Sequence, residues 1–240
     1  MDRHIRYFLF QMCLDIEHYL KVRLLNAITT DPEEDGYNIV RRFIKEEDPA
    51  FRILKSIDGH KSGTYCKDLI EKYYPVFPVW VFVELISFGD LIHFCSFYDA
   101  NSNYKVLSGI NNKFLNTVRD IRNACGHSNC MLNTMFLNLS GNRQADTRIR
   151  VFVSMNSSDP IISRSSQQKY LKNEFTYNLL TVFYVYSLLV PETARKNMYD
   201  DLSDFIHGRM CRNARYFVKH DRIKAMYEFW VKFIDNLHTK

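Results

Sequence analysis

One short segment of the chain gathers the residue types needed for acid–base chemistry on a phosphate. Residues 122–127 read Arg-Asn-Ala-Cys-Gly-His. The imidazole of His127 can act as a base or an acid near neutral pH, because its unperturbed pKa is about 6.5. The guanidinium of Arg122 is always charged and can hold a phosphate through two parallel hydrogen bonds. Metal-free RNA cleavage needs a proton acceptor for the 2′-OH, a proton donor for the leaving 5′ oxygen and a cation beside the phosphorane, so the segment predicts chemistry on RNA.

The spacing of Arg122 and His127 sets a geometric condition on such a site. Five residues of continuous helix rotate by about 500°, which points the two side chains roughly 140° apart. We predict that Gly126 ends the helix in the left-handed conformation, so that the chain turns back and His127 approaches Arg122. Asn123 can then bind a phosphate oxygen or fix the tautomer of the imidazole.

Two other interpretations of residues 122–127 remain open. The segment can be an ordinary capped helix end with one surface arginine and one hydrogen-bonded histidine. Cys125, His127 and Cys130 can instead be metal ligands, although a structural zinc site needs four ligands and the chain offers no matching pair elsewhere.

The same spacing recurs at Arg215 and His220, without the asparagine and the glycine. We interpret this second copy as coincidence. Its surroundings predict a basic face that holds an RNA backbone, and a solvated helix face explains them equally well. The predicted RNA-binding residues are Arg119, Arg212, Arg215 and Lys219.

The composition favours a helical protein with a single domain. The chain has 240 residues, is 46% hydrophobic, and contains only 8 glycines and 6 prolines. A many-stranded sandwich or barrel needs more turn residues than that. A chain of this length can bury a core without disulfides. The net charge of +5 mildly favours an anionic partner.

The expected location is the cytoplasm. No secretory signal is visible ahead of the first amphipathic pattern. The most apolar stretch, residues 175–190, would span only about 24 Å as a helix, so we interpret it as a buried helix and expect no contact with a membrane. The six cysteines lack CxxC spacing, which fits free thiols in a reducing compartment.

Apolar residues recurring every three or four positions predict most of the elements. Asp31-Pro32 should stop the first helix. Residues 147–153 alternate between apolar and polar types, which predicts a strand or hairpin. The predicted helices cover residues 3–29, 37–46, a segment ending near Tyr74, two segments meeting at Gly89-Asp90, and residues 111–126, 168–190, 192–206 and 221–238.

Glu84 is a polar residue in the otherwise apolar segment before Gly89. A buried glutamate needs a cationic partner or a raised pKa. Glu84 therefore either orients an active-site base or lies at the rim and faces solvent.

Three motifs within residues 5–133 together resemble one family. An N-terminal helix carries Glu17 followed by Lys21, a Trp-x-x-x-Glu block leads to Phe-Gly, and an Arg-Asn-x-x-x-His segment follows. In this order they resemble the abortive-infection phage-resistance family typified by AbiD and AbiF, a branch of the HEPN superfamily of helical ribonucleases. Family members also carry a basic residue shortly after the histidine, where this chain has Asn129 and Cys130, and an asparagine further on, which matches Asn133.

The resemblance implies an all-α, HEPN-like helical bundle with a small irregular or β-hairpin insertion near residues 140–166. Residues 1–240 would form one domain, with a motif core at about 3–133 and C-terminal helices at about 168–238. It also implies a homodimer in which two motifs face each other, so that two histidines divide the acid and base roles. The implied catalytic set is Arg122, Asn123 and His127, supported by Glu17, Glu84 and Asn133, with no metal and no cofactor.

The expected function is a metal-independent endoribonuclease that serves as a toxin in phage defence. Attack by the 2′-OH would leave a 2′,3′-cyclic phosphate. RNA and a second copy of the chain are the expected partners, and an antitoxin or regulatory RNA is a further candidate. The alternatives are a non-catalytic HEPN module that binds RNA or a protein, and a helical adaptor without nucleic-acid contact.

Overall fold

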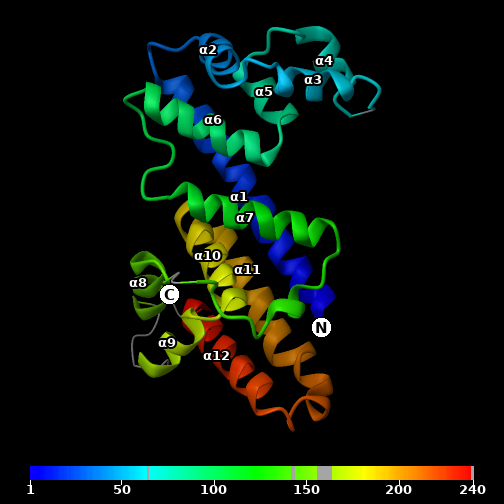
Figure 1. Cartoon of the computed structure of the whole chain (residues 1–240), viewed down its shortest axis with the longest axis vertical. Helices are drawn as coiled ribbons and strands as arrows, with labels where there is room; N and C mark the ends of the chain where they lie inside the picture. The colour runs from blue at the N-terminus through cyan, green and yellow to red at the C-terminus, as the bar shows by residue number, and fades with distance from the viewer. Residues whose placement is uncertain (64, 142–143, 156–163, 239–240) are drawn as a thin grey trace. The chain divides into compact units, whose positions relative to one another are not determined.

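The structure is a computed structural model that describes residues 1–63, 65–141, 144–155 and 164–238 (Figure 1). Within these residues all elements of secondary structure are helices, apart from one isolated β-bridge between Asn138 and Asn173. This confirms the predicted all-α class. None of the described helices is long and apolar enough to cross a membrane. The helices are α1 (Asp2–Thr30), α2 (Asn38–Glu47), α3 (Arg52–Gly59), α4 (Lys67–Tyr73), α5 (Val79–Leu85), α6 (Phe88–Asn101), α7 (Asn112–Gly126), α8 (Thr147–Met155), α9 (Arg164–Leu171), α10 (Glu174–Leu189), α11 (Glu192–Asp204) and α12 (Asp221–His238), with short turns η1 (Met131–Thr134), η2 (Phe205–Arg209) and η3 (Cys211–Tyr216).

The chain forms two compact units. We call the first the motif unit; it consists of Met1–Ile16 and Asp120–Lys240. The second unit is the continuous segment Glu17–Arg119. Helices α1 and α7 each contribute residues to both units. The single domain predicted from the sequence stays a prediction.

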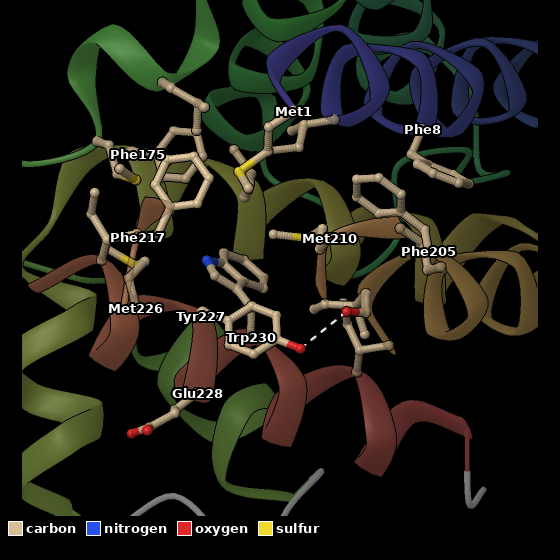
Figure 2. A pocket seen from close by; sticks show the side chains of 18 of the residues that line it. Met1, Phe8, Phe175, Phe205, Met210, Phe217, Met226, Tyr227, Glu228 and Trp230 are labelled. Atoms are coloured by element: carbon tan, nitrogen blue, oxygen red, sulfur yellow. Dashed lines mark hydrogen bonds between the residues drawn. The ribbon is translucent and has the colours of Figure 1, made fainter. Parts of the chain in front are cut away.

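The core of the motif unit is built around α10. Its side chains Leu180, Val182 and Val185 are fully buried, which confirms that the most apolar stretch is a buried helix. Phe183 packs edge-on against Phe233 of α12, with ring centroids 5.3 Å apart. Apolar side chains of α10 and α12 also line a cavity in this unit (Figure 2).

Asn173 divides the predicted helix 168–190 into α9 and α10. Its side-chain oxygen accepts the backbone N–H of Thr176 at 2.9 Å and so caps the start of α10. Its Nδ2 donates to the carbonyl oxygens of Met135 and Leu137 at 2.8 and 3.0 Å. The single long helix was therefore a wrong prediction, because this asparagine bonds to a distant segment as well as to its own helix.

The predicted strand at residues 147–153 is the helix α8, and the strand was a wrong prediction. Asp146 precedes the helix, and its carboxylate accepts the backbone N–H of Arg148 at 2.9 Å. Ile149 and Val153, four residues apart, are both fully buried, whereas Val151 is 43% exposed. Ile149 and Val153 thus lie on one face of a helix, one turn apart, although they also fit the alternating pattern of a strand. Asp146 caps the N-terminus and so favours the helix. The predicted insertion at 140–166 lies partly outside the described residues.

In the second unit, Ser87 rather than Gly89-Asp90 marks the boundary between the two apolar helices. Its hydroxyl oxygen accepts the backbone N–H of Asp90 at 3.1 Å and donates to the Asp90 carboxylate at 2.6 Å. This reciprocal arrangement caps α6 at its start, so Asp90 is the third residue of the helix and not its cap. The predicted junction was wrong by about three residues.

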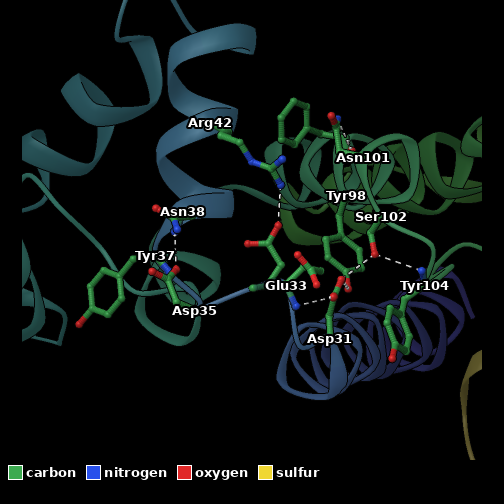
Figure 3. A network of polar contacts seen from close by, with 12 residues as sticks. Asp31, Glu33, Asp35, Tyr37, Asn38, Arg42, Tyr98, Asn101, Ser102 and Tyr104 are labelled. Carbon is green, nitrogen blue, oxygen red and sulfur yellow. Dashed lines mark hydrogen bonds and ion pairs between the residues drawn. The ribbon is translucent and has the colours of Figure 1, made fainter.

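A buried carboxylate follows the end of α1, where Asp31-Pro32 was predicted to stop the helix. Asp31 accepts hydrogen bonds from the hydroxyls of Ser102 and Tyr98 at 2.8 and 3.1 Å (Figure 3). The Ser102 hydroxyl is the chief cause of a lowered pKa for Asp31. Nearby, Arg42 pairs with Glu34 at 2.5 Å. These contacts tie the end of α1 to α6 and the loop after it, and the predicted stop is confirmed.

Candidate active site

Helix α7 ends in a Schellman motif centred on Ser128. The backbone N–H of Asn129 donates to the carbonyl of Ala124 at 2.9 Å, and that of Ser128 donates to Cys125 at 3.1 Å. Ser128 has a φ of +58°, whereas Gly126 is the last helical residue and has no positive φ. The predicted left-handed Gly126 was therefore wrong, because the reversal comes two residues later.

His127 consequently stays in the register of the helix. Its backbone N–H donates to the carbonyl of Asn123 at 2.9 Å, the bond that a further helical residue would make. Residues 123 and 127 lie one turn apart on the same face. The side chains of Arg122 and His127 therefore still point about 140° apart around the helix axis. His127 is exposed at the helix end, where it can reach a ligand.

Arg122 and Asn123 contact each other on α7. The Nη1 of Arg122 donates to the side-chain oxygen of Asn123 at 3.3 Å, and both residues are half-buried. Because the amide oxygen accepts from the guanidinium, the NH₂ group is what Asn123 can offer to a phosphate oxygen. The contact also restricts the orientation of the guanidinium.

The first turn of α1 holds the segment that follows His127. Arg6 Nη1 donates to the backbone carbonyl of Asn129 at 3.1 Å, and Arg6 is ion-paired with Asp2. The carboxylate of Asp2 accepts the backbone N–H of Leu132 at 3.0 Å. Sequence reasoning missed both residues, since Arg6 and Asn129 lie 123 positions apart and no local pattern links them. Arg6 thus places a cation next to Asn129, close to where members of the family that the sequence resembles carry a basic residue.

Cys125 belongs to the core rather than to a surface cluster. Its side chain is buried, and burial is the main cause that raises the pKa of the thiol to about 11. A metal ligand has to be a thiolate, so this environment does not suit one. Among the described residues, no group of three or more His, Cys, Asp or Glu is arranged to hold a metal.

The three residues predicted to support the motif fall in both units. Asn133 lies in η1 of the motif unit and is exposed. Glu17 and Glu84 belong to the second unit. Lys21 Nζ lies 3.4 Å from the Glu84 carboxylate, which is 55% exposed, so Glu84 has the solvent-facing position of the second alternative. This ion pair joins the first two motifs of the family resemblance.

The predicted RNA-binding residues are also divided between the units. Arg119 is half-buried in the second unit, where a Cβ at Gly89 would lie 3.5 Å from its Cδ. Arg212, Arg215 and Lys219 are exposed on η3 and the turn after it. His220 caps the start of α12, since the N–H of Lys224 donates to its carbonyl at 3.0 Å. Arg215 and His220 therefore do not share a helix. Arg122 and Asn123, by contrast, both lie in α7.

Comparison with known protein families gives a match over the N-terminal part of the chain. The model of a family described as Abi-like protein matches residues 1–133, which is more than half of the chain. No curated protein and no solved structure matches. The matched segment contains all of α7 and the Schellman motif, and it ends in η1.

Proposed function

The chain belongs to the Abi-like protein family, and from that premise we propose that it is a HEPN-type endoribonuclease acting in abortive infection. The observation that carries the proposal is the helix end itself. It presents an exposed histidine one turn after an asparagine that is hydrogen-bonded to an arginine. These are the three residues that resemble the catalytic set of the superfamily.

Each residue has a role that its contacts support. Arg122 holds the scissile phosphate and balances the charge that develops on it, since a guanidinium can donate two parallel hydrogen bonds. Asn123 restrains the guanidinium through the 3.3 Å contact. His127 moves protons: as a base it takes the proton of the 2′-OH, whose oxygen then attacks phosphorus; as an acid it protonates the departing 5′ oxygen. The products are a 2′,3′-cyclic phosphate and a free 5′-OH.

Two copies of the chain complete this chemistry better than one. A single motif supplies one histidine, but the reaction needs an acid and a base at the same time. Within one copy, Arg122 and His127 also diverge because α7 continues through Gly126. A homodimer that places two α7 ends face to face would provide two imidazoles and let an arginine and a histidine approach one phosphate from opposite sides.

The direct test is cleavage of a mixed RNA pool by the purified chain in EDTA, with mapping of the product ends. We expect cyclic-phosphate ends from the wild type. His127→Ala and Arg122→Ala should each reduce the rate by at least about 100-fold, the loss typical for general acid–base groups and charge-stabilising groups. Their circular dichroism spectra should match that of the wild type.

The second Arg/His pair provides matched controls. Arg215→Ala and His220→Ala remove the same residue types at the same spacing, away from the end of α7. His220→Ala should cleave RNA like the wild type, and Arg215→Ala, which removes a predicted RNA contact, should weaken RNA binding without abolishing cleavage. Undiminished cleavage by His127→Ala and Arg122→Ala would refute the catalytic assignment.

Mixing experiments test the composite site. Adding excess His127→Ala chains to the wild type should lower the activity per wild-type chain, because mixed dimers carry one imidazole where two are needed. Sites confined to single chains would keep that activity constant, which would exclude the composite site.

The competing function is an RNA-binding HEPN module that does not cut. The observation in its favour is that Asn129 and Cys130 stand where the family carries a basic residue. A gel shift by both the wild type and His127→Ala, with no cleavage by either, would establish this alternative.

A further inference from the structure

The motif unit contains an apolar cavity of about 380 Å³. Its walls come from the first turns of α1, from η1, from α10, from the chain between α11 and α12, and from α12 itself. Figure 2 shows Met1 and Phe8 on one side, Phe175 and Phe217 on another, and Phe205 and Met210 opposite them. The volume falls in the range of about 300–1,000 Å³ typical of small-molecule sites.

The wall is formed almost entirely by carbon and sulfur. Lys224 and Glu228 are also among its residues, but their side chains are 60% and 56% exposed, and Figure 2 shows the Glu228 carboxylate pointing away from the other side chains. The hydroxyl of Tyr227 donates to the carbonyl of Ile206 at 3.0 Å and is thus engaged with the wall. Five methionines contribute, and their flexible thioethers adapt to ligands of different shape. The methionines are Met1, Met12, Met135, Met210 and Met226.

Trp230 adds one polar group to this apolar space. Its indole lies in the middle of the cavity, against Phe183, Phe229 and Phe233, with ring centroids 5.5–6.0 Å apart. In the part of the chain that the structure describes, its nitrogen donates to no protein acceptor. An indole N–H in an apolar site usually finds a partner.

Water is a poor occupant of this space. A buried water needs two to four polar partners, whereas the cavity offers a single donor. A carbon-rich molecule would regain the dispersion contacts that the lining side chains lack. Charged molecules are disfavoured, because nothing in the interior compensates their desolvation.

We propose that this cavity binds an uncharged, apolar small molecule with one carbonyl-type oxygen, which accepts the N–H of Trp230. The proposal does not depend on RNA cleavage. The lining of the cavity determines what can occupy it. An aliphatic or aromatic body fills the apolar space, and the single oxygen of the ligand accepts from the single donor, the N–H of Trp230.

Occupancy of the cavity is linked to the candidate active site through η1. Leu132 and Met135 both line the cavity. The backbone N–H of Leu132 is bound by Asp2, whose partner Arg6 holds the carbonyl of Asn129. A ligand that packs against Leu132 therefore stabilises the segment immediately after His127.

The test uses the full chain and the uncharged probe N-phenyl-1-naphthylamine, which fluoresces in apolar surroundings. We expect a saturable rise in emission with one site per chain. Ala214→Trp places an indole on the cavity wall and should weaken probe binding at least about tenfold. Trp80→Phe, which alters an exposed tryptophan of the second unit, should bind like the wild type. Circular dichroism verifies that each variant is folded.

The acceptor is tested by displacement of the probe with 2-nonanone and 1-nonene. In each protein, the affinity for 2-nonanone is divided by the affinity for 1-nonene. This ratio should be about three- to tenfold higher in the wild type than in Trp230→Phe, because the wild type forms one more hydrogen bond to the ketone. Comparing ratios cancels the different solubilities of the two competitors. Equal ratios in the two proteins would overturn the role of Trp230.

Two further results would overturn the site or its link to η1. If the probe signal disappears as the chain self-associates, a second copy fills the cavity and no small molecule does. If saturating 2-nonanone leaves amide hydrogen exchange of residues 129–135 unchanged, the link to η1 is wrong. Slower exchange in that segment would support it.

Discussion

Arg6 donates a hydrogen bond from Nη1 to the backbone carbonyl of Asn129 at 3.1 Å, so the first turn of α1 holds the chain just after His127. Its guanidinium is at the same time paired with Asp2, whose carboxylate accepts the N–H of Leu132. Two residues at the start of the chain thus fix both ends of the segment 129–132.

Arg6→Ala should loosen this segment and weaken catalysis. Amide exchange of Asn129–Leu132 should become faster, and RNA cleavage should fall by about tenfold or more, because small displacements of a reacting group cost large factors in rate. Hydrogen exchange and single-turnover cleavage measure the two effects. Arg3→Ala removes the same charge from an exposed position and is the control. Equal losses in both variants would mean that Arg6 acts only through net charge.

Gly126→Ala and Ser128→Gly should both stabilise the protein. Gly126 is helical, and an added Cβ would lie at an ordinary 3.6 Å from Phe10, so alanine should raise the free energy of unfolding by up to about 1 kcal/mol. Ser128 has a positive φ, which glycine adopts without strain, and a gain of about 0.5–1 kcal/mol is expected. Urea denaturation measures both. Destabilisation by Gly126→Ala would place the left-handed residue at 126 after all.

Two valines in α8 distinguish a helix from a strand. Val153→Ala should lower the free energy of unfolding by about 1–3 kcal/mol, because Val153 is fully buried. Val151→Ala, on the exposed side, should change it by less than about 0.5 kcal/mol. In a strand the two side chains would share one face and the two costs would be similar. Thermal or urea unfolding of the pair decides between the two structures.

Ser102→Ala should make stability depend differently on pH. The Ser102 hydroxyl is the largest cause of the lowered pKa of Asp31, with smaller help from the N–H of Glu33, the hydroxyl of Tyr98 and the charge of Arg42. A carboxyl whose pKa is lowered on folding stabilises the fold above its unfolded pKa of about 3.9, and this contribution is lost as the pH falls through the folded pKa. The variant should be less stable at pH 7, and the difference should shrink below about pH 3.9. A difference that does not vary with pH would show that Ser102 contributes by packing alone.

The long periodic helices were predictable from the sequence. Residues 3–29 and 111–126 were predicted within one residue of the ends of α1 and α7, since their apolar stripes run over many turns. The family resemblance could also be recognised from the sequence, because each of its motifs is a short run of neighbouring residues.

The errors concern residues whose conformation depends on more than their type. Gly89 was taken as a helix end and Gly126 as a left-handed residue. Instead, Ser87 caps α6 through a side-chain hydrogen bond, and Ser128 has the left-handed backbone after α7. At 147–153, the pair Ile149 and Val153 fits both an alternating strand and a helix turn, and only the burial of both with Val151 outside resolves it.

What lies around the motif was the least predictable part of the candidate site. Asp2 and Arg6 reach residues more than 120 positions away, and no periodicity or spacing marks such contacts. The division of the chain into two units was equally hidden, because its boundaries fall inside α1 and α7 rather than in a linker.

The discontinuous motif unit imposes an order on biosynthesis. The second unit is one uninterrupted segment, so it can fold while the ribosome is still at work. Met1–Ile16 must instead wait for α10, where Tyr186 donates to the carboxylate of Asp15 at 2.9 Å, and for α12, which completes the core. The end of α7 therefore acquires its full surroundings only after α12 has been synthesised, and a nascent chain that stops short of α12 does not yet have them.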